Sequence, residues 1–260
     1  MSPNDALQRM RDGAPLVHCI TNYVAMNIAA NVVLAAGASP AMLHASEEVA
    51  DFVPIVGALT INIGTLSPSW VAAMEKAAQS AQQARVPWVL DPVAHFVTPY
   101  RTAVVRDLLV LKPTIIRGNA SEILALAGEG ASGKGADSGD SVAAARDAAI
   151  RLAQAQSCII AVTGEVDFVT DGNRHADIAG GADVMPKVTA LGCALTALVG
   201  AYAAICPALE ATVAALTHFA EAGARAAPAS RGPGSFAVEF LDNLAKITPG
   251  DLNEGRVTWS

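Results

Sequence analysis

Short apolar runs alternate with longer stretches of helical periodicity through the first two thirds of the chain. The runs are rich in β-branched residues and read as buried strands, because a strand needs only a few consecutive apolar positions. Strands are predicted over residues 16–20, 58–63, 88–91, 114–117, 158–163 and 167–170, with a weaker one near 38–42. Helices are predicted over residues 24–36, 68–84, 101–109, 120–128 and 142–154. This alternation predicts an α/β fold with a mostly parallel central sheet and helices on both faces.

The last third of the chain is mostly helical in its pattern. Apolar residues recur at helical spacing from Leu195 onward, which predicts a helix over residues 194–206 that Pro207 ends. Two more helices are predicted over residues 209–227 and 234–246. We expect residues 1–260 to form a single domain, because no repeat is visible and no long linker interrupts the pattern.

The glycine-rich segment 128–139 is the one flexible connection that the pattern predicts. Within it, Gly128, Gly130 and Gly133 match the dinucleotide pattern GxGxxG, and Lys134 nearly completes a P-loop. Both motifs must follow a strand and open a helix. This segment follows a predicted helix instead, so we interpret it as a loop.

Composition narrows the classes of function. The chain has 260 residues, is 52% hydrophobic and carries a net charge of −7, so it has material for a large core and no basic surface for nucleic acid. Its four cysteines form no CxxC pair and its five histidines no HExxH motif, which argues against a disulfide framework or a zinc site. Residues 1–13 are charged and lack the apolar core of a signal peptide, so we expect a cytoplasmic protein.

Two uncharged segments, residues 23–43 and 188–209, are long enough to span a membrane. Both are rich in alanine and interrupted by glycine and proline, and neither has a basic flank. We therefore expect buried helices and turns at these positions, and no membrane partner.

Polar residues follow several predicted strands, where the chain turns. Polar residues at or just after such ends are Asn22, Asn62, Asp91, Arg117 and Thr163. In parallel α/β sheets the ligand binds beyond the carboxyl ends of the strands, so we expect these side chains to line one site.

The turn over residues 189–193 opens directly into an uncharged helix. Helix N-termini present unpaired N–H groups and a partial positive charge, which together favour a phosphate. A cysteine at such a place is expected to have a lowered pKa, which would let Cys193 act on a proton. The alternative for Cys193 is a small buried residue at a tight turn.

Asp91 and Glu122 could together hold Mg²⁺, which binds carboxylates, water and phosphate oxygens. Each also has a purely structural interpretation, since Asp91 could cap a turn and Glu122 could form a capping box with Asn119. Arg117 is suited to a phosphate or to a surface ion pair, and the Thr163 hydroxyl to a nucleotide phosphate or to the turn that follows it.

In order and spacing, these segments resemble the hydroxyethylthiazole kinase family of the ribokinase-like superfamily, over nearly the whole chain. The segments that carry the resemblance are 17-VHCITNYV-24, 37-GASPAM-42, 61-INIGTL-66, 90-LDPV-93, 116-IRGNASEI-123, 134-KGADS-138 and 187-KVT-189 through 192-GC-193.

The resemblance implies transfer of the γ-phosphoryl group of ATP to the hydroxyl of 4-methyl-5-(2-hydroxyethyl)thiazole by a homotrimer with active sites between subunits. The roles that it implies are substrate binding by Met42, Ala190 and Asn22, ATP binding by Arg117, Thr163 and Asn119, Mg²⁺ binding by Asp91 and Glu122, and catalysis by Cys193 and Gly192. Cys193 would occupy the place of the catalytic aspartate of related sugar and pyrimidine kinases.

The chain departs from the family pattern at two turns. Ala190-Leu191 stands where the family usually has Gly-Thr, and Ala94-His95-Phe96 where it usually has Gly-Ala-Gly. These changes bear on substrate range and turnover more than on the fold. The alternatives are a hydroxymethylpyrimidine-type kinase, a non-catalytic thiazole-binding homologue and, from the GxGxxG match, an NAD-dependent oxidoreductase.

Overall fold

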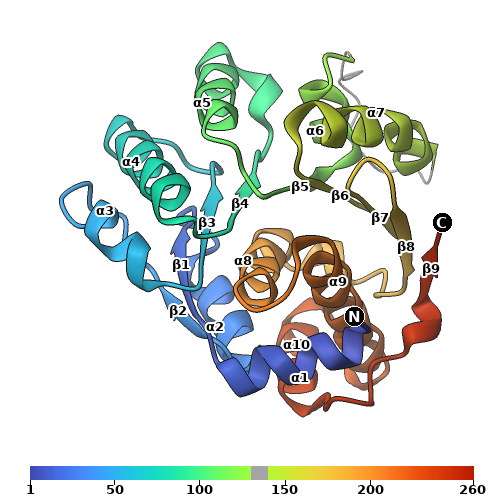
Figure 1. Cartoon of the computed structure of the whole chain (residues 1–260). Helices are drawn as coiled ribbons and strands as arrows, with labels where there is room; N and C mark the ends of the chain where they lie inside the picture. Colours follow the sequence, from blue (N-terminus) through green and yellow to red (C-terminus); the bar gives the residue numbers. More distant parts are fainter. Residues whose placement is uncertain (130–139) are drawn as a thin grey trace.

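The computed structural model describes residues 1–129 and 140–260, which form one sheet of nine strands wrapped by helices (Figure 1). The strand order is β2-β1-β3-β4-β5-β6-β7-β8-β9. The strands are β1 (Leu16–Ile20), β2 (Ser39–Ala41), β3 (Ala58–Asn62), β4 (Trp88–Asp91), β5 (Ile115–Asn119), β6 (Ile159–Thr163), β7 (Val166–Thr170), β8 (His175–Ala179) and β9 (Val257–Trp259).

The sheet is parallel from β2 to β6 and antiparallel beyond. Every predicted strand is present, with boundaries shifted by at most two residues, so the predicted α/β class and mostly parallel sheet are confirmed. The sequence pattern missed β8 and β9. In β8 buried and half-exposed positions alternate, and β9 has only three residues, so neither makes a continuous apolar run.

Helices cover both faces of the sheet, as predicted. In Figure 1 the strands follow an arc, with α8 and α9 inside it and α4, α5, α6 and α7 outside. The helices are α1 (Pro3–Gly13), α2 (Met26–Ala36), α3 (Val49–Phe52), α4 (Pro68–Ala84), α5 (Pro99–Val110), α6 (Ala120–Leu126), α7 (Asp140–Gln156), α8 (Leu191–Ala203), α9 (Ala208–Ala226) and α10 (Pro233–Lys246).

Helix α8 begins at Leu191, three residues before the predicted start, and ends at Ala203. Gly192 and Cys193 therefore lie inside its first turn and not in a loop before it. Helix α1 was not predicted, although the polar side chains of Ser2 and Asp5 form a capping box at its start. Only four of its residues are buried, and charged residues lie among them, so its apolar pattern was too short to predict a helix.

Each of the two long uncharged segments contributes a helix to the core, although Tyr23, Val24 and Leu34 in the first segment are exposed. The helices α2 and α8 within them pack against each other inside the arc of the sheet. Among the described residues, no helix combines the length and apolar character that a membrane span requires.

Helix α8 approaches the sheet closely at Gly200. A Cβ atom there would collide with the side chain of Thr60 on β3 and lie 3.2 Å from Cγ1 of Val17 on β1. The glycine thus sets how near the N-terminus of α8 comes to the strand ends.

We expect Gly200→Ala to lower the free energy of unfolding by about 1–3 kcal/mol, because an added methyl group overpacks this contact. Gly234→Ala is the matched control, since a Cβ atom at that position in α10 meets nothing within 4 Å. Urea denaturation of the two variants measures the difference, and equal stabilities would contradict the role given to Gly200.

Candidate active site

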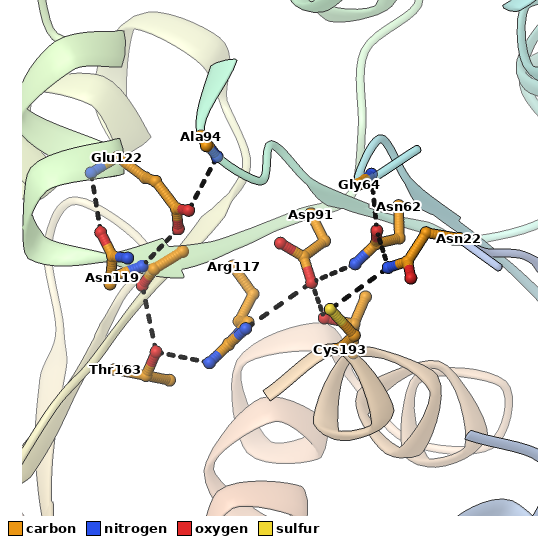
Figure 2. A network of polar contacts seen from close by, with 12 residues as sticks. Asn22, Asn62, Gly64, Asp91, Ala94, Arg117, Asn119, Glu122, Thr163 and Cys193 are labelled. Carbon is orange, nitrogen blue, oxygen red and sulfur yellow. Dashed lines mark hydrogen bonds and ion pairs between the residues drawn. The ribbon is translucent and has the colours of Figure 1, made fainter. Parts of the chain in front are cut away.

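The carboxyl ends of the parallel strands bring the predicted polar residues to one edge of the sheet. Asn22 follows β1, Asp91 ends β4, Arg117 lies in β5 and Thr163 ends β6. The N-terminus of α8 faces these strand ends, and Figure 2 shows Cys193 beside the side chains that they carry.

Asp91 is the centre of this arrangement and is only 1% exposed. Its Oδ2 atom accepts hydrogen bonds from Asn62 Nδ2 and from Thr196 Oγ1, both at 2.7 Å, and lies 3.6 Å from Nη1 of Arg117. Its Oδ1 atom is buried without a hydrogen-bond partner among the described residues. Burial raises the pKa of Asp91 to about 6, and the Arg117 charge is the strongest influence in the other direction.

Arg117 connects Asp91 to the nucleotide side of the site that the sequence predicted. Its Nη2 atom donates to Thr163 Oγ1 at 2.6 Å, and Thr163 Oγ1 donates in turn to the carbonyl oxygen of Gly118 at 3.3 Å. The surface ion pair considered for Arg117 is therefore wrong, because its partner is the buried Asp91.

Glu122 and Asn119 form the capping box that begins α6. Asn119 Oδ1 accepts from the Glu122 amide at 2.9 Å, and Glu122 Oε2 accepts from the Asn119 amide at 2.8 Å. Glu122 Oε1 accepts from the amide of Ala94 at 2.9 Å. The structural interpretation of Glu122 is confirmed, and the same carboxylate also borders the cavity described below.

The first turn of α8 presents free backbone donors. The amides of Gly192 and Cys193 have no backbone acceptor among the described residues, and no side chain caps the helix. Gly192 lies against Arg117, since a Cβ atom there would be 3.3 and 3.4 Å from its two terminal nitrogens. Unpaired amides beside a guanidinium group suit an anion.

The expected lowering of the Cys193 pKa is wrong. Burial and the Asp91 charge raise the pKa of this thiol, and the side-chain amides of Asn62 and of Asn22, whose Nδ2 lies 3.4 Å from Sγ, offset part of that effect. The helix N-terminus suggested the opposite, but at Cys193 removal from water dominates. The thiol is therefore predominantly protonated at neutral pH.

A cavity of about 1120 Å³ opens over these residues. Its walls come from the ends of β4, β5 and β6, the hairpin after β6, and the segment that leads into α8. The predicted site residues that line it are Asp91, Arg117, Asn119, Glu122, Thr163, Ala190, Gly192 and Cys193. Asn22 does not line it but reaches Cys193 from the other side.

Met42 is separate from this group. It follows edge strand β2, is partly buried against the core and does not line the cavity. His95 does not line the cavity either, so the proposed contact of His95 with phosphate has no support within the described chain. Burial lowers the pKa of His95.

Two residues of the site, Thr196 and Asp167, were not recognised in the sequence, and Asn62 was noted there only as a polar residue at a strand end. Asn62 and Thr196 both donate to Asp91, and Asp167 lines the cavity with its pKa raised to about 6 by burial. Asn62 stands at a strand end, and Thr196 lies one helical turn after Cys193. Those positions were a usable signal, but the shared partner Asp91 is distant in sequence.

The segment 128–139 bears on the oxidoreductase alternative. Gly128 follows helix α6 and not a strand, so the context that a dinucleotide fold or a P-loop requires is missing there. Residues 130–139, including Lys134 and the last part of this pattern, lie outside the described residues.

The sequence profile of the hydroxyethylthiazole kinase family matches residues 7–250. The chain belongs to this family. It is 62% identical to the hydroxyethylthiazole kinase of Roseobacter denitrificans over 97% of this chain and 98% of that one. Identity to the enzyme of Gemmatimonas aurantiaca is 59% over 100% of this chain and 94% of the relative. The protein is accordingly a kinase.

Solved structures agree with this assignment. The hydroxyethylthiazole kinase of Pyrococcus horikoshii superposes with a TM-score of 0.91 at 38% identity, covering 99% of this chain and 98% of that one. A pyridoxal kinase of Bacillus subtilis, at 19% identity, superposes with a TM-score of 0.61 over 80% of this chain and 90% of its own. The latter shows the shared ribokinase-like fold alone.

The two departures from the hydroxyethylthiazole kinase pattern adopt a glycine-like backbone. Ala190, the N-cap of α8, has φ 60°, and Ala94, whose amide binds Glu122, has φ 48°. Both lie in the left-handed region, where a Cβ atom costs about 1 kcal/mol. The turns thus keep the geometry that glycine favours while carrying a methyl group.

We expect Cys193 to react slowly with iodoacetamide near pH 7, and its rate to rise about tenfold per pH unit up to a pKa above that of a free thiol. The raised pKa is the reason, since only the thiolate reacts. Mass spectrometry of the Cys193 peptide measures the rate, with the urea-unfolded protein as reference. A rate that levels off below about pH 8 would instead show a lowered pKa.

Proposed function

We propose that the protein transfers the γ-phosphoryl group of ATP to the hydroxyl of 4-methyl-5-(2-hydroxyethyl)thiazole, which yields the thiazole phosphate for thiamine salvage. The observation that carries this proposal is the opposition of Arg117 and Asp91 to the free amides at the start of α8, within one cavity. The choice of hydroxyethylthiazole as the acceptor alcohol follows from the relatives, which are named hydroxyethylthiazole kinases.

The cavity has room for a nucleotide, and its donors are distributed as the reaction requires. Arg117 and Thr163 bind the ATP phosphates, and Asn119 borders the same space. The acceptor lies near Asn22 and Ala190, and the expected contact with Met42 would come from another copy of the chain, because Met42 does not line the cavity of its own chain. Its hydroxyl oxygen forms a bond to the γ-phosphorus, the bond from that phosphorus to the bridging oxygen of ADP breaks, and the hydroxyl proton is released.

Charge stabilisation contributes most to this step, because phosphoryl transfer demands little of a base. The amides of Gly192 and Cys193 face the transferring group, and preorganised donors of this kind each contribute about 3–4 kcal/mol. Because its raised pKa keeps Cys193 mostly protonated at neutral pH, only the minor thiolate form can accept the hydroxyl proton, which limits Cys193 to an assisting role.

The residues fit a Mg²⁺ ion that arrives with ATP. Among the described residues, no three His, Cys, Asp or Glu side chains cluster as a metal cage. Mg²⁺ needs no such cage, since it binds through one or two carboxylates, water and phosphate oxygens. The Oδ1 atom of Asp91, which no described residue contacts by a hydrogen bond, is suited to this role, and Glu122 adds a second carboxylate. The ion would neutralise charge on the phosphates.

We also propose that residues 1–260 act as a single kinase domain in the cytoplasm, where ATP is available, and that three copies assemble with active sites between them. Two features support assembly. Met42 does not reach the cavity of its own chain, and Tyr23 and Val24, beside Asn22, are 66% and 58% exposed. Light scattering of the purified protein measures the number of copies.

With purified protein and Mg-ATP, we expect ADP release that depends on hydroxyethylthiazole. Cys193→Ala should lower kcat and leave the affinity for ATP nearly unchanged, because Cys193 acts on the acceptor side. Cys206→Ala, which changes a buried thiol just beyond the far end of α8, is the matched control. Absence of thiazole-dependent ADP release would contradict the proposed function. It is the result expected if the protein only binds the thiazole and does not phosphorylate it.

We expect Glu122→Gln to raise the Mg²⁺ concentration needed for half-maximal activity, because it removes a charge beside the proposed ion. The change also weakens the α6 cap. Asn119→Ala breaks the same capping box but keeps the carboxylate, so it separates the two effects in a magnesium titration. If the Asn119 variant shifts the titration as far as Glu122→Gln does, Glu122 acts only as a cap.

A further inference from the structure

Asn62 links Asp91 to Asn22 in the polar network that Figure 2 shows. The sequence placed it at a strand end, but neither the sequence nor the resemblance gave it a role. It ends β3, which lies between β1 and β4 in the sheet, and it pairs in register with Asp91. Its side chain is buried, with 2% of the residue exposed. An amide at this position can reach the ends of both neighbouring strands.

Both ends of the Asn62 amide are committed. Its Oδ1 atom accepts from the backbone amide of Gly64 at 2.9 Å and from Asn22 Nδ2 at 2.8 Å. Because a backbone N–H can only donate, the oxygen must face Gly64, which leaves Nδ2 directed at Asp91 Oδ2 at 2.7 Å. The orientation of the side chain is therefore fixed by three partners.

That orientation determines which oxygen of Asp91 is available. Oδ2 is occupied by Asn62 and Thr196 and lies near Arg117, whereas Oδ1 has no partner in the described part of the chain. Rotating the carboxylate would break both hydrogen bonds. The two donors thus keep one oxygen of a buried carboxylate free for a ligand.

The same amide reaches the acceptor side of the site through Asn22. Asn22 Nδ2 bonds to Asn62 Oδ1 and also lies 3.4 Å from Cys193 Sγ. A continuous chain of contacts therefore runs from Cys193 through Asn22 and Asn62 to Asp91. It joins the first turn of α8 to the ends of three adjacent strands.

We propose that Asn62 is a positioning residue for phosphoryl transfer, which holds the free oxygen of Asp91 toward the cavity and ties it to Asn22 and Cys193. The proposal rests on the proposed function for its reaction. It also concerns binding of Mg-nucleotide alone, which can be measured without an acceptor.

Asn62→Asp is the decisive variant. It keeps an oxygen for Gly64 and Asn22, so the turn after β3 remains capped, but it removes the N–H donated to Asp91. Thr196→Val removes the other donor to Oδ2. Thr60→Val is the matched control, because Thr60 is a buried β3 residue whose hydroxyl bonds to the Cys19 thiol and not to the site.

We expect Asn62→Asp to lower kcat by about tenfold to a hundredfold, the range for residues that orient a ligand-binding group, with a much smaller change in KM for ATP. ADP with Mg²⁺ should raise the Tm of the wild type more than ADP alone does. We expect this additional rise to be smaller in Asn62→Asp. Thr196→Val should act in the same direction, and Thr60→Val should leave kcat and this Tm increment unchanged.

If Asn62→Asp has the same kcat and the same Mg²⁺-dependent Tm increment as the wild type, the proposal is overturned and Asn62 only stabilises the turn after β3. Equal losses in Asn62→Asp and Thr60→Val would overturn it as well, since any buried polar change would then suffice. If the wild type lacks thiazole kinase activity but Asn62→Asp still loses the Mg²⁺-dependent increment, the proposed function fails and the positioning role stands.

Discussion

A buried carboxylate imposes the strictest requirement on this structure. Removing Asp91 from water disfavours its charged form, and the charge is tolerable only where donors and a cation surround it. Asn62, Thr196 and Arg117 supply that compensation from β3, α8 and β5. The three elements must therefore keep their relative positions for Asp91 to remain ionised.

The parallel sheet makes this convergence possible. Residues more than a hundred positions apart, such as Asp91 and Thr196, meet because strand ends collect at one edge and α8 is directed at that edge. Two glycines allow the close approach. Gly200 brings the middle of α8 against β3, and Gly192 brings its first turn against Arg117. Packing at Gly200, outside the cavity lining, thus helps to set the distance between the backbone donors and the carboxylate.

The fold and much of the site were accessible from local sequence pattern. Asp91, Arg117 and Thr163 stand at the ends of strongly apolar strands, so their convergence follows from the sheet. Strand β8 was missed because only two of its five positions are fully buried, so its apolar pattern is weak. The shared attachment of Asn62 and Thr196 to Asp91 is a tertiary fact that local pattern does not encode.

The prediction for Cys193 failed for a related reason. The sequence shows that Cys193 lies at a helix N-terminus, which by itself lowers a thiol pKa. The exclusion of water around Sγ, which raises the pKa, depends on the tertiary structure of the whole site. Position along the chain identified where the thiol lies. Burial and the nearby Asp91 charge decided how it titrates.

Ala190 and Ala94, which have a left-handed backbone conformation, show which contacts of the site are made by the backbone and which by side chains. At φ 60° Ala190 still begins α8 so that the amides of Gly192 and Cys193 are free, and at φ 48° Ala94 still donates to Glu122. The cost of about 1 kcal/mol at each is small beside the stability of a domain. An anion site made of main-chain N–H groups needs no particular side chain at these turns. Substitutions there change the walls of the cavity while the donors stay in place.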